Sequence, residues 1–136
     1  MTQEDKKLLL KDICARLPYG VKMNHIADGE HSPKTLIGLA KDMITLEGLG
    51  GYECVDVEDY KPYLFPLSSM NEEQKREYNF WKHEVPVCHY EYGDVVEEIE
   101  LYDSPNSFEY LIENHFDYYG LIPMGLANDA TGLNIY

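Results

Sequence analysis

The sequence predicts an α+β fold in a single domain, with a mostly antiparallel sheet and helices at the start, in the centre and near the C-terminal end. One observation is that apolar residues near the start of the chain recur at steps of three and four, which is typical of an amphipathic helix. A second is a series of short apolar runs separated by turn residues, and a third is a pair of alternating runs on either side of Gly93. The length of 136 residues suits one domain over residues 1–136.

The first helix is expected over Gln3–Leu17. The hydroxyl of Thr2 can cap it, and the acidic side chains of its first turn suit the positive end of the helix dipole. Pro18 and Gly20 then end the helix. Its apolar stripe comprises Leu9, Leu10, Ile13, Cys14 and Leu17.

Four strands are expected after this helix. The turn residues Asp28-Gly29 separate the first two strands, and a glycine-rich break precedes the fourth. The strands are Val21–Ala27, Thr35–Ala40, Met43–Glu47 and Tyr52–Tyr60. A helix over Lys34–Leu46 is the alternative, because its apolar residues also suit a period of 3.6; we favour strands.

A connector and a central helix follow the strands. Lys61–Pro66 contains two prolines and is expected to be an extended connector outside the sheet. Ser69 or Asn71 can cap the helix, which is expected to reach about His83. Its inward side chains are expected to be Tyr78, Phe80 and Trp81.

Val85–Tyr92 and Val95–Tyr102 are expected to form a hairpin. Gly93-Asp94 suits a type II′ turn, which pairs Tyr92 with Val95. This register gives one face with Cys88, Tyr90, Tyr92, Val95, Ile99 and Leu101. The other face carries His89, Glu91, Glu98 and Glu100 beside Val87 and Val96. Glu97 is the one acidic residue that this register places on the apolar face.

The last helix is expected to begin at Pro105, with Asp103 or Ser104 as its cap, and to reach about Phe116. Its inner stripe comprises Phe108, Leu111, Ile112 and His115, and Glu109 and Glu113 share its outer face. The segment from Gly120 is expected to fold back over the core through Leu121, Ile122, Met124 and Leu126.

Charge is distributed unevenly along the chain. The formal net charge is −14, and residues 84–136 contribute −11 through eleven carboxylates, without one lysine or arginine. This segment repels nucleic acid and anionic lipid, and it attracts a basic protein surface. Glu98 and Glu100 would lie about 6.5–7 Å apart on a strand, which is comparable with the phosphate pitch of a nucleic acid. Imitation of DNA toward a DNA-binding protein is therefore one form of the expected partnership. The alternative is a solvated acidic face that only maintains solubility.

The sequence predicts no catalytic, cofactor or metal site. His25, Asp28, Glu30 and His31 match no zinc or calcium spacing and are expected to form a polar hairpin tip. Cys88 and His89 would point to opposite faces of a strand, so they form no dyad. The three cysteines are Cys14, Cys54 and Cys88; they form no CxxC pair, and we expect free, buried thiols in a reducing cytoplasm.

Three segments resemble a family of small proteins from gut anaerobic bacteria, often encoded on phage-like or other mobile elements. They are Lys11–Gly20, Lys61–Met70 and Phe116–Ala127. The resemblance brings no activity, cofactor or catalytic residue. It implies an accessory protein that acts on a macromolecule of the host or the phage.

The function expected from the sequence is a non-enzymatic module that binds a basic protein. The expected contact residues are Glu91, Glu98, Glu100, Glu109 and Glu113. The rival interpretation is a small-molecule or metal-dependent enzyme whose site is assembled from residues distant in sequence. An acidic surface favours the first interpretation, and a deep pocket with convergent histidine and carboxylate groups favours the second.

Overall fold

The computed structural model describes residues 1–27 and 32–136. It confirms the α+β class, with three helices, a mostly antiparallel six-stranded sheet and a hairpin. The chain forms two compact units: residues 1–69 with 112–136, and residues 70–111. We refer to them as the sheet unit and the hairpin unit.

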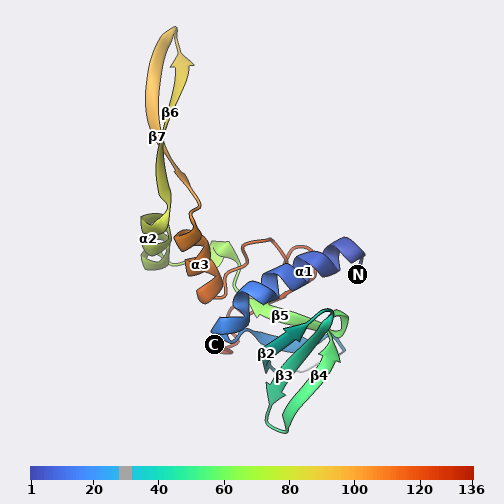
Figure 1. Ribbon diagram of the computed structural model, residues 1–136. Helices are drawn as coiled ribbons and strands as arrows, with labels where there is room; N and C mark the ends of the chain where they lie inside the picture. Colours follow the sequence, from blue (N-terminus) through green and yellow to red (C-terminus); the bar gives the residue numbers. More distant parts are fainter. Residues whose placement is uncertain (28–31) are drawn as a thin grey trace. The chain divides into compact units, whose positions relative to one another are not determined.

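Helix α1 (Gln3–Arg16) begins as its sequence predicts. Thr2 and Asp5 form a capping box, in which each side chain accepts a hydrogen bond from the other residue's backbone N–H. Leu9 and Ile13 are fully buried, and they pack the helix against the sheet (Figure 1). Cys14 is exposed, so the prediction that it is buried is wrong. The buried positions beside the stripe belong instead to Asp12 and Arg16.

The sheet has the order β4-β3-β2-β1-β5-β8. Its strands are β1 (Lys22–His25), β2 (Lys34–Ala40), β3 (Met43–Gly48), β4 (Gly51–Asp56), β5 (Tyr60–Leu64) and β8 (Asn128–Asp129). All neighbours are antiparallel except β5 and β8. The strands favoured within Lys34–Leu46 are therefore confirmed, and the alternative helix there is wrong. The predicted turn at Asp28-Gly29 lies outside the described residues.

Strand β5 corrects two predictions. The expected strand Tyr52–Tyr60 ends at Asp56, where the short helix η2 (Val57–Asp59) intervenes. The expected connector Lys61–Pro66 instead supplies most of β5, which pairs with β1 on one side. On the other side β8 pairs with Tyr63 and Leu64, so no strand of the described residues faces Pro62 there and its missing N–H is tolerated.

The remaining segments of the sheet unit cover its core. The short helices η1 (Leu17–Tyr19) and η3 (Leu67–Ser69) follow α1 and β5. Leu121, Leu126 and Ala127 join the core cluster and Ile122 packs against it, as predicted for the returning segment. Met124 does not, because 48% of it is exposed.

The hairpin unit contains α2 (Glu72–Trp81), β6 (His83–Glu91), β7 (Asp94–Tyr102) and most of α3 (Pro105–Glu113). Asn71 caps α2 in a capping box with Gln74. The expectation that Phe80 and Trp81 point inward is wrong, because their exposed fractions are 76% and 45%. No residue of α2 is buried, so its aromatic side chains stay partly in water.

Helix α3 begins at Pro105 as predicted, and Ser104 is its cap. Ser104 Oγ accepts a hydrogen bond of 3.0 Å from Ser107 N, and Ser107 Oγ accepts one of 2.7 Å from Ser104 N. The helix ends at Glu113, three residues before the predicted end, because His115 adopts a left-handed backbone with φ of 63°. Among residues 1–27 and 32–136, no helix is long and apolar enough to cross a bilayer.

Candidate functional site

Among the described residues, β6 and β7 form a separate two-stranded hairpin, whose turn differs from the prediction. Glu91 pairs with Asp94, so the turn residues are Tyr92 and Gly93, with φ of 52° and 84°. Two successive positive φ angles are the mark of a type I′ turn. The predicted type II′ turn at Gly93-Asp94 is wrong, because the glycine takes the second of two left-handed positions.

The composition of the two faces is nevertheless as predicted. The observed register shifts β7 by two residues relative to β6, and a shift of two leaves every side chain on its own face. Tyr90 lies opposite Val95, and Cys88 lies opposite Glu97. Tyr92 alone leaves the predicted apolar face, because it now lies in the turn.

The apolar face of the hairpin is exposed. Exposed fractions are 82% for Tyr90, 63% for Val95, 66% for Ile99 and 43% for Leu101. Cys88 is exposed as well, so its predicted burial is wrong. No element in the described part of the chain covers this face of the two-stranded sheet, and its apolar side chains therefore remain in contact with water.

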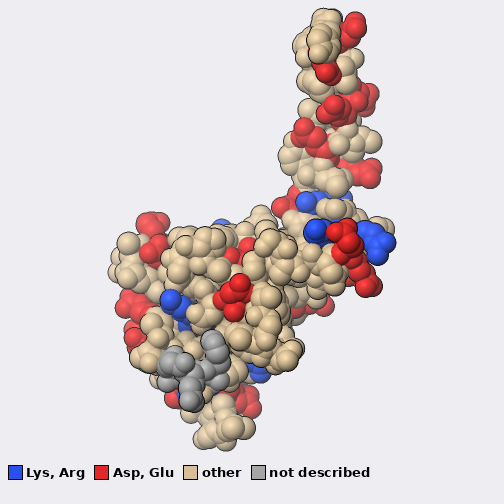
Figure 2. Space-filling model, turned by 180° about the vertical axis from the view of Figure 1, so that it is seen from behind, with Lys and Arg blue, Asp and Glu red and all other residues tan. Residues whose placement is uncertain are grey.

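Acidic side chains follow the opposite face. Glu98 and Glu100 alternate along β7, and Glu91 and Asp94 lie opposite each other beside the turn. Figure 2 shows acidic side chains spread along the hairpin, with Lys and Arg side chains gathered at its base. Within residues 1–27 and 32–136, no lysine or arginine forms an ion pair with a hairpin carboxylate.

Two polar contacts lie within this acidic face. His89 Nε2 is 3.8 Å from a carboxylate oxygen of Glu91. The Tyr102 hydroxyl donates a hydrogen bond of 2.5 Å to Glu100, and this bond raises the pKa of Tyr102. Neither contact involves a lysine or an arginine.

The structure groups three of the five predicted contact residues. Glu91, Glu98 and Glu100 share one face of the hairpin. Glu109 and Glu113 are exposed on α3, one in the hairpin unit and the other in the sheet unit. The candidate site is therefore the acidic face of the hairpin, which we define as Glu91, Asp94, Glu98 and Glu100.

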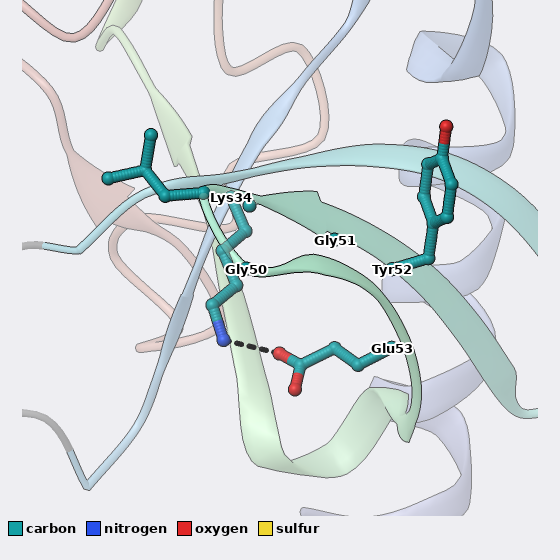
Figure 3. Close-up of a pocket in the computed structure, with 7 residues that line it drawn as sticks. Lys34, Gly50, Gly51, Tyr52 and Glu53 are labelled. Carbon is teal, nitrogen blue, oxygen red and sulfur yellow. Dashed lines mark hydrogen bonds and ion pairs between the residues drawn. The ribbon is translucent and has the colours of Figure 1, made fainter.

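A small pocket of about 160 Å³ lies beside the β3–β4 turn in the sheet unit (Figure 3). Lys34 forms an ion pair with Glu53 in this pocket, and the hydrogen bond from Lys34 lowers the pKa of Glu53. The ring of Tyr52 points away from that pair (Figure 3). The two charges of the pocket satisfy each other, so this pocket gives no support to the enzymatic interpretation.

A buried polar cluster in the sheet unit was missed from the sequence. Arg16 and Asp12 have no exposed side-chain surface, and two hydrogen bonds of 2.8 and 3.0 Å join them. Arg16 Nη2 also donates a bond of 2.5 Å to the carbonyl of Phe116. Burial raises the pKa of Asp12, although the charge of Arg16 opposes that rise. The sequence contains one indication of this ion pair: Asp12 and Arg16 are four residues apart on the helix, next to its apolar stripe.

His115 stacks on Tyr136 next to this cluster, with ring centroids 3.7 Å apart. The Tyr136 hydroxyl accepts a hydrogen bond from Lys22 N and donates one to the Tyr63 carbonyl, each of 2.8 Å. This hydroxyl therefore joins β1 and β5. Burial lowers the pKa of His115 to about 4, and the charges of Arg16 and Lys22 add to the effect.

We expect His115 to reduce stability in mild acid. The unfolded chain binds a proton at this histidine near pH 6.5, whereas the folded chain resists protonation until about pH 4. The free energy of unfolding should fall across this interval, by about 1–2 kcal/mol after allowance for solvent screening. His115→Phe keeps the aromatic stack and should lack this part of the loss in urea unfolding at several pH values. Parallel pH profiles of the two proteins would contradict the assignment.

The described residues show the placement of metal-ligating side chains and of thiols. Within residues 1–27 and 32–136, no group of three or more histidine, cysteine or acidic residues is placed to hold a metal ion. Asp28, Glu30 and His31 of the predicted polar tip lie outside the described residues. The cysteines are free as predicted, but all three are exposed.

Comparison of the chain with protein-family models, curated proteins and solved structures finds no match. The resemblance to the gut-bacterial family stays a prediction.

Proposed function

We propose that this protein is a non-enzymatic binding module that presents the acidic face of its hairpin to a basic partner protein. The observation that carries the proposal is the set of four exposed carboxylates on one face, without a lysine or arginine partner in the described part of the chain. Glu109 and Glu113, the two other expected contact residues, are exposed on α3 and lie outside this face.

The physical gain of such a surface is mainly in the rate of association. Exposed charges attract an oppositely charged partner over roughly one Debye length, about 8 Å at physiological ionic strength. Complementary charge therefore speeds encounter and orients the partner more than it strengthens the final complex. The hairpin is suited to this role because its acidic side chains are exposed and form no ion pair with a lysine or arginine of the described residues.

A capture experiment with charge-matched variants tests the proposal. The protein is coupled to a resin and exposed to a bacterial lysate at low and high salt, and bound proteins are identified by mass spectrometry. We expect basic proteins to bind at low salt and to be released at high salt. The triple variant Glu91→Gln, Glu98→Gln and Glu100→Gln should lose this binding.

The control removes the same number of charges elsewhere. Glu4, Glu47 and Glu73 are exposed and lie outside the hairpin. Their conversion to glutamine should leave capture almost unchanged, and a further variant with Glu109→Gln and Glu113→Gln measures the contribution of α3. Equal loss in both triple variants, or capture that ignores salt, would show that the acidic face has no special role.

A further inference from the structure

The turn fixes which backbone groups of the hairpin point outward. In a hairpin with a two-residue loop, the residues that flank the loop exchange both backbone hydrogen bonds, and bonded and non-bonded pairs then alternate. Glu91 and Asp94 flank the loop here. The non-bonded pairs are consequently Tyr90 with Val95, Cys88 with Glu97, Pro86 with Ile99, and Glu84 with Leu101. Their N–H and C=O groups point away from the partner strand.

The two edges of the hairpin are not equivalent. The β6 edge contains Pro86, which has no N–H, and the alternation places this gap on the outward side. Proline at such a position interrupts pairing with a further strand. The β7 edge is complete, because its four outward positions, Val95, Glu97, Ile99 and Leu101, all have a backbone N–H.

The β7 edge is also unpaired. Among the described residues the sheet contains β6 and β7 alone. β7 has nine residues, and the apolar side chains of the hairpin are exposed. Such an unpaired edge is a template for pairing with another strand. A hairpin that leaves both faces in water is marginally stable by itself, and a third strand would add both hydrogen bonds and apolar contact.

We propose that the β7 edge binds an extended segment of the basic partner as a third, added strand. This inference rests on the proposed function and specifies how the partner binds. Alternate side chains of the added strand would lie on the two faces of the enlarged sheet. Basic side chains would then lie beside Glu98 and Glu100, and apolar ones beside Ile99 and Leu101. The partner segment therefore alternates basic and apolar residues.

Charge argues against a second copy of this chain as the occupant. Pairing of β7 with β7 would bring two sets of Glu97, Glu98 and Glu100 together at a spacing of about 5 Å between strands. Each molecule also carries a net charge of −14. A basic strand meets the same groups with opposite sign.

Synthetic peptides test the proposal with the intact protein. The probe is a fluorescent nonapeptide of alternating lysine and valine, measured by anisotropy at low salt. One control has the same composition with the two residue types in blocks. Two further peptides carry backbone N-methyl groups, one peptide on its odd-numbered residues and the other on its even-numbered residues. Since alternate N–H groups of a strand point to opposite sides, one of the two peptides loses its hydrogen-bond donors toward β7 while it keeps its charge. We expect one methylated peptide and the block peptide to bind at least about tenfold more weakly than the probe.

Matched proline variants test the edge itself. Glu97→Pro removes an outward N–H from β7, and Cys88→Pro removes the one directly across the hairpin on β6. Neither change removes a hydrogen bond between the two strands. We expect Glu97→Pro to weaken binding of the probe about tenfold and Cys88→Pro to change it less than about twofold. Glu97→Gln separates the effect of the lost charge from that of the lost N–H.

The outcomes distinguish this inference from the proposed function. Binding that needs Glu91, Glu98 and Glu100 but ignores N-methylation and Glu97→Pro would overturn strand addition and leave the acidic docking surface intact. A dimer of the protein in sedimentation that Glu97→Pro dissociates would assign the edge to a second copy and overturn the basic occupant. Absence of binding by every lysine-containing peptide would overturn strand addition, whereas the lysate capture decides the proposed function.

Discussion

Replacement of Asp12 by alanine is expected to destabilise the protein by about 3–5 kcal/mol, because it leaves the guanidinium of Arg16 buried without its counter-ion. Both side chains have no exposed surface, and both oxygens of Asp12 accept hydrogen bonds from Arg16. Arg16 Nη1 already has no partner among the described residues. Only the carbonyl of Phe116 would remain to it. Urea unfolding followed by tyrosine fluorescence gives the free energy directly.

A double variant separates an unpaired charge from a loss of packing. Asp12→Leu with Arg16→Met replaces the ion pair by apolar side chains, and such replacements are often neutral or stabilising. We expect the double variant to recover most of the stability that Asp12→Ala loses. Loss of less than about 1 kcal/mol in Asp12→Ala would mean that water reaches Arg16 and that the pair is not buried as described.

Replacement of Asp117 by alanine is expected to cost about 2–4 kcal/mol, because it removes the acceptor of two backbone N–H groups. Asp117 is 5% exposed. Its carboxylate accepts hydrogen bonds of 2.7 Å from Leu121 N and 2.9 Å from Ile122 N. These bonds hold the start of the segment that places Leu121 in the core. Thermal and urea unfolding measure the loss.

Asp117→Asn is the matched control for this change. The amide keeps one acceptor oxygen and the approximate shape, so we expect a loss about half that of alanine. Asp129→Ala offers a second comparison, because Asp129 also accepts a backbone hydrogen bond, of 2.9 Å from Thr131 N, but is exposed. It should cost about 1 kcal/mol or less. Equal losses at the two positions would show that burial is not the cause.

Local sequence patterns predicted where most helices and strands lie. Contacts between distant segments determine which strands pair and which side chains are buried. Thr2 and Ser104 cap their helices as the sequence indicates, because a cap involves groups only three residues apart. β5 was missed because Pro62 argues against a sheet interior, and the sequence does not reveal that β8 stops short of it. Phe80 and Trp81 were misplaced because aromatic side chains predict burial only when another element covers them.

The candidate site shows the same division. The alternation of side chains along each strand assigned Glu91, Glu98 and Glu100 to one face of the hairpin. This assignment is correct although the predicted turn is wrong, because a register shift of an even number of residues leaves each side chain on its own face. The buried cluster was not predicted, since Arg16 meets the Phe116 carbonyl across 100 residues of sequence. No local pattern reports a contact at that separation.

The division of the chain into two units has a consequence for the order of folding. The hairpin unit interrupts the sheet unit in sequence, so the core partners Leu121 and Leu126 are synthesised after residues 70–111. Every pair of β6 with β7 joins residues at most 19 positions apart, whereas the core of the sheet unit joins Leu9 to Leu121. The hairpin can therefore close early on the ribosome, while the nascent sheet remains incomplete until its last segment emerges.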